Sequence, residues 1–99
     1  MAISFHWHLE KAKSNLAKHK VSFGEAATVF ANPQAVIVPD ERHSITETRE
    51  IIVGHSSKNR LLVVSFTERK SAIRIISARV ATRKERQKYE ERPNPKKQT

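Results

Sequence analysis

Residues 60–79, RLLVVSFTERKSAIRIISAR, give the clearest indication of the fold in this sequence. It contains two runs rich in apolar and β-branched residues, 60–68 and 72–79, separated by the short polar break Arg69-Lys70-Ser71. Two such runs with a short break predict a β-hairpin. Residues 61–66 are nearly continuous in apolar side chains, which is typical of a central strand covered on both faces.

Upstream of this hairpin the sequence predicts two further strands. Residues 49–55 are joined to 60–68 by the break Ser56-Ser57-Lys58-Asn59, which suits a second hairpin, and residues 35–38 form a short strand closed by Pro39. The intervening residues 40–48 are polar and without periodicity, so we expect an exposed loop there. Four strands in succession predict an antiparallel meander.

The first 31 residues predict a strand and two helices. Residues 3–7 alternate apolar and polar side chains, and residues 9–19 show helical spacing. The side chains expected to face inward are Ile3, Phe5 and Trp7 on the strand and Leu9, Ala12, Leu16 and His19 on the helix, with His6 and His8 outward. A second helix is expected over 22–31, where Ser22 and Glu25 form a capping box and Asn32-Pro33 ends the helix.

The C-terminal part predicts a polar helix. Thr82 and Glu85 form another capping box, so a helix is expected over 83–92, with Tyr89 as its one large apolar residue. Residues 93–99 are rich in Pro and Lys, and we expect them to be disordered. The sequence therefore predicts one α+β domain over residues 1–92, in which two N-terminal helices pack on an antiparallel sheet.

Charge is the strongest global signal. Lys and Arg number 19 against 10 Asp and Glu, a net charge of +9. Residues 1–54 hold six basic and six acidic side chains, whereas residues 55–99 hold 13 basic and four acidic ones. An excess confined to one half indicates a polyanionic partner, above all a nucleic acid, although solubility alone is the plain alternative. A membrane surface fits less well, because no basic helix carries a broad apolar face.

The composition excludes several classes of protein. The chain has no Cys, so disulfides and thiolate metal sites are excluded and a cytoplasmic location is expected. No apolar run approaches the length of a membrane span, and Glu10, Lys11 and Lys13 fall where a secretory signal needs its apolar core. Motifs for phosphate loops, nucleophile elbows and zinc helices are missing, so no cofactor is expected. His6 and His8 have a spacing that could bind a metal, but no third ligand is evident.

With only two Gly in the chain, a phosphate must be held by side chains. Strict alternation places Arg74 and Arg79 on opposite faces of the strand 72–79. An arginine within an apolar strand either pairs with a carboxylate, for which Glu68 and Glu50 are candidates, or lies in a groove and binds a phosphate through its forked donors.

Cleavage of RNA without a metal needs a base for the 2′-hydroxyl, an acid for the leaving 5′-oxygen and cations for the charge on phosphorus. Glu68 or Glu85 could be the base, and His55 could be base or acid because histidine titrates near neutrality. Glu85 is also explained by the capping box, and His55 by an ordinary surface position. Tyr89 could stack on a base or could anchor its helix.

Two blocks of sequence are specific when they are taken together. The first begins with Phe5-His6-Trp7 and continues through KHKVSF, residues 18–23, and the second joins RIISAR, residues 74–79, to Arg83-Lys84-Glu85-Arg86. Together they resemble the BrnT family, ribonuclease toxins of bacterial toxin–antitoxin pairs, and the resemblance extends over roughly residues 5–90.

The resemblance implies a RelE-like fold and a metal-independent endoribonuclease that inhibits translation. It also implies a DNA-binding antitoxin of the BrnA kind, which neutralises the toxin in a hetero-oligomer on operator DNA. Similar sequences often carry Arg at the position of His55. The expected catalytic residues are Arg79, Arg83, Glu85, Glu68 and His55. The expected RNA-binding residues are Arg60, Arg69, Arg74, Arg86 and Tyr89.

Two other functions fit the same charge pattern. A non-catalytic nucleic-acid-binding module would bind RNA in a salt-dependent manner and leave it intact. A protein-interaction subunit would use the basic face to bind an acidic partner. For any protein partner, we expect contacts with the polar helix 83–92 or with the sheet face that carries Arg79.

Overall fold

The computed structural model describes residues 3–40 and 48–92, so most of the predicted loop 40–48 and the whole tail 93–99 lie outside the described residues. The elements in chain order are β1 (Ser4–His6), α1 (Leu9–His19), α2 (Phe23–Thr28), the short 3-10 helix η1 (Val29–Ala31), β2 (Val36–Pro39), β3 (Glu50–His55), β4 (Leu61–Arg69), β5 (Ala72–Val80) and α3 (Arg83–Glu91). The predicted order of helices and strands is confirmed.

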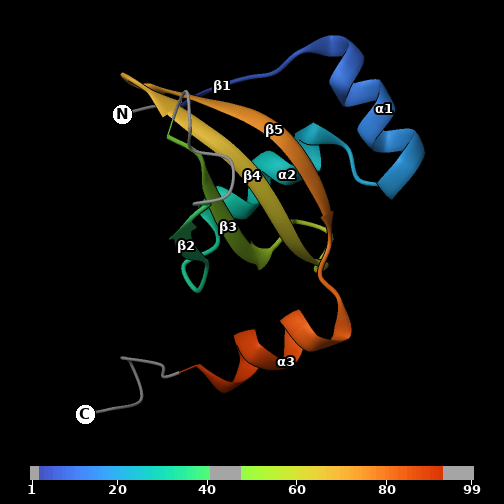
Figure 1. Cartoon of the computed structure of the whole chain (residues 1–99), viewed down its shortest axis with the longest axis vertical. Helices are drawn as coiled ribbons and strands as arrows, with labels where there is room; N and C mark the ends of the chain where they lie inside the picture. The colour runs from blue at the N-terminus through green and yellow to red at the C-terminus, as the bar shows by residue number, and fades with distance from the viewer. Residues whose placement is uncertain (1–2, 41–47, 93–99) are drawn as a thin grey trace.

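The strands form one five-stranded sheet in the order β1-β5-β4-β3-β2. The pairs from β2 to β5 are antiparallel, which confirms the predicted meander, and β1 adds to the outer edge of β5 in parallel. Helices α1 and α2 lie on one side of the sheet, and α3 lies beyond its lower end (Figure 1). None of the helices in the described ranges is long and apolar enough to cross a membrane.

The core lies between α2 and the sheet. Phe23 and Ala26 of α2 and Val29 of η1 pack against buried strand residues that include Val64 and Phe66. Ala27 and Phe30, at helical spacing from Phe23, are partly buried against the same core. The ring of Phe30 lies between those of Phe5 and Phe66, with centroid distances of 5.3 and 4.9 Å. Burial of these aromatic and aliphatic side chains is the main favourable term in the folding of a domain this small.

The inward stripe predicted for the N-terminal strand and α1 is wrong in part. Ile3 is 54% exposed, and Leu9 and Leu16 are 64% and 49% exposed. Trp7 is 39% exposed, but its indole meets the buried ring of Phe23 edge-on at a centroid distance of 6.0 Å. Strand β1 ends at His6, before Trp7. Helix α1 packs against β5 and buries Asn15, so its leucines point away from the sheet.

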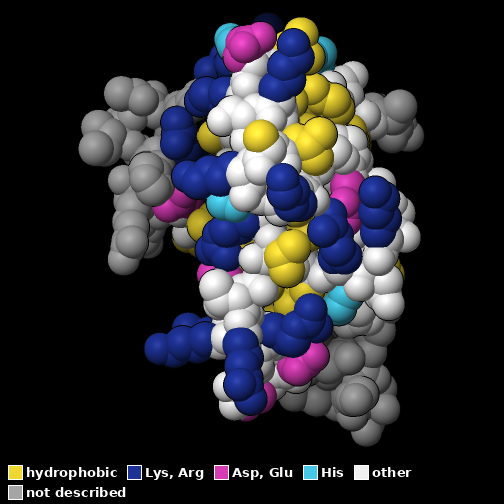
Figure 2. Space-filling model, turned by 90° about the vertical axis from the view of Figure 1, so that its right-hand side faces the viewer, with side chains coloured by type: hydrophobic (Ala, Val, Ile, Leu, Met, Phe, Trp, Pro, Cys, Tyr) yellow, Lys and Arg dark blue, Asp and Glu magenta, His cyan; other side chains and the backbone are white. Residues whose placement is uncertain are grey.

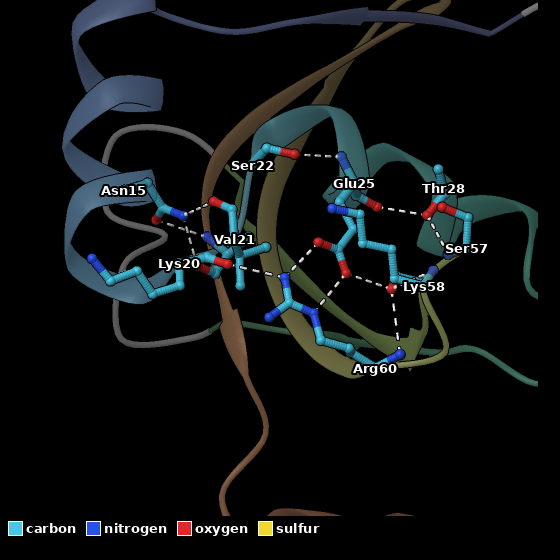
Figure 3. Close-up of polar contacts among 11 residues, drawn as sticks. Asn15, Lys20, Val21, Ser22, Glu25, Thr28, Ser57, Lys58 and Arg60 are labelled. Carbon is cyan, nitrogen blue, oxygen red and sulfur yellow. Dashed lines mark hydrogen bonds and ion pairs between the residues drawn. The ribbon is translucent and has the colours of Figure 1, made fainter.

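Asn15 attaches α1 to the sheet through three hydrogen bonds (Figure 3). Its amide nitrogen donates to the carbonyl oxygens of Val21 and Ala78 at 3.0 and 2.8 Å, and its Oδ1 accepts from the Ala78 amide at 3.1 Å. Strand β1 pairs with β5 only as far as Arg74, so Asn15 supplies the edge of β5 with partners that a longer β1 would have provided. Because the buried side-chain amide of Asn15 makes all three hydrogen bonds, it stabilises the fold.

Glu25 does not complete the predicted capping box. Ser22 Oγ accepts from the Glu25 amide at 3.0 Å, as expected, but the Glu25 carboxylate turns to Arg60 and Ser56 instead (Figure 3). Arg60 Nε donates to Glu25 Oε2 at 2.9 Å, and Ser56 Oγ donates to the same oxygen at 2.6 Å. The hydrogen bond from Arg60 is the main reason why the pKa of this buried carboxyl is lowered. Arg60 also donates to the Lys20 carbonyl, so one ion pair joins both helices to the β3–β4 hairpin.

We predict that Asn15→Ala destabilises the fold by about 1–3 kcal/mol, because the buried backbone groups of Val21 and Ala78 lose their partner. Urea unfolding of the variant beside Ser14→Ala, an exposed neighbour on the same helix, measures this difference. Equal midpoints for the two variants would contradict the role assigned to Asn15.

Candidate nucleic-acid interface and active site

A β-bulge interrupts the pairing of β4 with β5. Ser65 lies opposite Ser77, but the next residue of β4, Phe66, lies opposite Ile75. Ile76 is therefore an extra residue in β5, and the alternation of inward and outward side chains changes phase there.

The bulge brings the arginines of β5 to one side of the sheet. Arg74 lies opposite Thr67 and Arg79 opposite Val63. Thr67 and Val63 are four residues apart on β4, so they point to the same face, the one opposite to α1 and α2, which we call the second face. The prediction that Arg74 and Arg79 point to opposite faces was wrong, because it assumed unbroken alternation.

Arg79 is held by Glu85 at the start of α3. Its two terminal nitrogens donate to the two oxygens of Glu85 at 2.7 and 2.8 Å, and both side chains are 38% exposed. The sequence had suggested Glu68 or Glu50 as partners of the strand arginines. Glu85 also completes the predicted capping box, because its Oε1 accepts from the Thr82 amide at 2.9 Å.

This arrangement lowers the pKa of Glu85 to about 2, and the hydrogen bond from Arg79 is the largest cause. The same bond raises the pKa of Arg79. A carboxylate with such a low pKa is a weak base at neutral pH. The Glu85 carboxylate instead holds the guanidinium of Arg79 in one orientation. The remaining N–H groups of Arg79 can donate to another anion.

Tyr89 anchors α3 to the sheet. Its side chain is 9% exposed, and its hydroxyl donates to the Gln34 carbonyl at 2.9 Å. The guanidinium carbon of Arg92 lies 3.8 Å from the ring centroid, and the ring of His55 meets the tyrosine ring edge-on at 5.9 Å. Of the two roles that the sequence left open, this geometry is that of the anchor, since the ring is enclosed by its neighbours.

The three residues proposed for acid–base chemistry are not together. His55 lies opposite Leu61 at the lower end of the sheet, near α3, whereas Glu68 lies opposite Ile73 at the upper end. Seven residues of extended β4 separate the two ends, roughly 23 Å. His55 and Glu85 thus share the end of the sheet that carries Arg79, and Glu68 does not.

The remaining arginines of the predicted site are dispersed. Arg60 belongs to the ion pair with Glu25, and Arg69 and Arg74 lie at the upper end of the sheet. Arg83 is exposed in the first turn of α3, and Arg86 lies on the same helix, 3.8 Å from Glu90. Figure 2 shows Lys and Arg side chains spread over the side of the molecule that carries α1, β5 and α3, with few acidic side chains among them.

Two features of this surface are missed by reasoning from sequence. Ser77 lies on the second face between Arg74 and Arg79, which depends on the bulge. His6 and Trp7 lie beside Arg74, because β1 pairs in parallel with β5. The block Phe5-His6-Trp7 was a signal of resemblance but gave no indication of this neighbourhood. Within residues 3–40 and 48–92, no three His, Asp or Glu side chains are grouped as metal ligands.

An α+β domain with basic side chains along one strand and the following helix has the features of a protein that acts on a polyanion. The sequence matches the model of the BrnT family, described as the ribonuclease toxin BrnT of type II toxin–antitoxin systems, over residues 7–85. The chain therefore belongs to the BrnT family of ribonuclease toxins.

The fold agrees with a solved structure of the same family. The crystal structure of the Brucella abortus ribonuclease toxin BrnT superposes with a TM-score of 0.65 at 22% sequence identity, covering 83% of this chain and 100% of that chain. A search of curated proteins found no match.

The pairing of Glu85 with Arg79 predicts a pH-dependent stability. The pKa of Glu85 is about 2 in the folded chain against an ordinary 4.5, so the pair stabilises the fold above pH 4.5 and this contribution is lost as the pH falls toward 2. With solvent screening, we expect about 1 kcal/mol. Between these pH values, the free energy of unfolding in urea should fall by about 1 kcal/mol more for the wild type than for Glu85→Gln. Glu25, whose pKa is also lowered, contributes equally to the pH dependence of both proteins. Glu91→Gln, on the same helix, should behave as the wild type does; equal slopes for all three proteins would contradict the prediction.

Proposed function

We propose that this BrnT-family chain is a metal-independent endoribonuclease that inhibits translation by cleaving RNA. The observation that carries the proposal is the set of cationic side chains that follows β5, with Arg74 and Arg79 on the second face and Arg83 at the start of α3. Cations spaced in this way can bind several phosphates of one RNA strand. Fixed guanidinium groups can also supply the positive charge that a metal ion supplies in other nucleases.

The reaction that fits these residues is transfer within the RNA strand. The 2′-oxygen attacks the adjacent phosphorus and loses its proton to a base, and the bond to the 5′-oxygen breaks as that oxygen gains a proton from an acid. The products are a 2′,3′-cyclic phosphate and a 5′-hydroxyl. Arg79 would donate to the phosphate oxygens, and its orientation is fixed by Glu85 before RNA binds.

The roles within this group are unequal. Glu85 is a positioning residue, because its low pKa makes it a poor proton acceptor at neutral pH. His55, on the same face with β4 between it and the end of β5, is the proposed acid or base. Arg83, which is exposed in the first turn of α3, would bind the phosphate next to the one that reacts.

Control of this activity is proposed to follow the type II pattern. A DNA-binding antitoxin of the BrnA kind would cover the second face or α3, and the complex would bind operator DNA in the cytoplasm. Family membership supports an antitoxin partner. The apolar groove between α3 and the sheet, about 320 Å³ and lined by Val36, Val38, Val53 and Tyr89 among others, supports α3 as part of that contact.

A binding module without catalysis is the second candidate. It is favoured by the separation of Glu68 from His55 and by the engagement of Glu85 with Arg79, which together leave few groups for proton transfer. RNA that is bound with a steep salt dependence but stays intact would identify this function.

We predict cleavage of RNA in EDTA, with 2′,3′-cyclic or 3′-phosphate ends, and a loss of about 100- to 1,000-fold in kcat/KM for Arg79→Ala. Gel analysis of end-labelled RNA, with and without ribosomes, measures both. Lys13→Ala on α1 removes one positive charge elsewhere and should cleave at nearly the normal rate. A folded Arg79→Ala protein that cleaves as fast as Lys13→Ala would refute the role of Arg79.

A further inference from the structure

A second basic group lies at the upper end of the sheet, away from Arg79. Here β1, β5 and the end of β4 enclose a pocket of about 290 Å³, which we call the Arg74 pocket. Its lining residues are His6, Trp7, His8, Arg69, Ala72 and Arg74. This volume is near the lower limit for small-molecule sites and suits one nucleotide.

The strand pairing explains why these residues meet. His6 lies opposite Arg74 in the parallel pair of β1 with β5, and Arg69 lies opposite Ala72 where β4 turns into β5. Opposed residues in a sheet point to the same face, so the side chains of His6 and Arg74 both lie on the second face. Trp7 follows directly after β1 at the rim, 39% exposed.

The chemistry of the lining is that of an anion site with an aromatic wall. It combines two guanidinium groups, two imidazoles and one indole, and no acidic side chain from the described part of the chain lines it. Among the described residues, Arg74 has no hydrogen bond or ion pair with another side chain, in contrast to Arg79 and Arg60, which are held by carboxylates. Arginine forks bind phosphates, and an indole stacks on a nucleobase.

The Arg74 pocket lies on the same face of the sheet as Arg79 of the proposed active site. Arg74 and Arg79 lie on the same face of the same strand, five residues apart, which is roughly 16 Å along β5. Ser77 lies between them on that face and can donate a hydrogen bond to a phosphate. An extended RNA strand that follows β5 from Arg79 therefore reaches the Arg74 pocket within a few nucleotides.

We propose that the Arg74 pocket is a nucleotide subsite for single-stranded RNA, in which Arg74 binds a phosphate and Trp7 stacks on the adjoining base. The subsite holds the substrate at a distance from the bond that is cut. This inference rests on the proposed ribonuclease function and adds to it a second contact point along the strand.

Trp7 makes the subsite directly observable, because it is the only Trp in the sequence. Stacking of a base on its indole should quench its fluorescence. The probe is a 2′-O-methyl hexaribonucleotide, which cannot be cleaved, titrated into the wild type, Arg74→Ala, Arg79→Ala and Lys58→Ala, the last an exposed lysine of the β3–β4 turn. We expect saturable quenching of equal affinity with the wild type and Lys58→Ala. For Arg79→Ala we expect full quenching at a higher Kd, because Arg79 binds another phosphate of the same strand. For Arg74→Ala, we expect a Kd about 10-fold higher and a salt slope lower by about one.

A second readout covers the case in which Arg74→Ala folds poorly. Trp7→Phe retains an aromatic wall and Trp7→Leu removes it, so anisotropy of the labelled oligonucleotide should show nearly normal affinity for the first and weaker affinity for the second. The proposal is overturned if the oligonucleotide binds without quenching, or if Arg74→Ala binds it as well as Lys58→Ala does. It is also overturned if Arg74→Ala loses affinity for the antitoxin alone, since the pocket would then be a protein contact.

The two proposals fail in different ways. If the wild type binds the oligonucleotide with quenching but does not cut RNA in EDTA, the ribonuclease proposal fails and the subsite stands. If the wild type cuts RNA and the titrations show no effect of Arg74→Ala, the subsite fails and the ribonuclease proposal stands.

Discussion

One extra residue in β5, Ile76, determines which side chains the second face presents. Without the bulge, either Arg74 or Arg79 would point into the core beneath α2, where an unpaired guanidinium costs several kcal/mol. With it, Ile73 and Ala78 both lie in the core while both arginines lie outside it. The bulge therefore reconciles two demands on one strand, an apolar inner face and a cationic outer face.

The helices are held to this sheet by polar contacts as much as by apolar packing. Asn15 connects α1 to the edge of β5, and Glu25 connects α2 to the β3–β4 hairpin through Arg60. In a chain of 99 residues the apolar core is small, and α1 contributes little to it because Leu9 and Leu16 point outward. Directional bonds of this kind fix where a helix lies, which a thin apolar contact alone does not.

Much of the fold could be predicted from local patterns, and the arrangement of the site could not. The order of the elements and the meander follow from periodicity, capping and turn residues, which are patterns within a few residues of each position. The burial of Asn15 depends on Ala78, 63 positions away, and the choice of Arg60 by Glu25 depends on a residue 35 positions away. The residue pattern and the resemblance both point to Arg79 and Glu85, but the bidentate pairing of these two residues and the shared face of the arginines are properties of three-dimensional packing.

The pair of Arg79 with Glu85 and the Arg74 pocket differ in the sequence separation of the residues that form them. Arg79 and Glu85 are neighbours within six residues, so a short segment around the start of α3 is enough to form their pair. His6 meets Arg74 only when β1 pairs with β5, a contact between residues 68 positions apart that carries a large loop-closure entropy. Loss of this strand pairing would therefore dismantle the Arg74 pocket and leave the pair of Arg79 and Glu85 intact, so the pairing of the N-terminal strand determines whether the basic face includes that pocket.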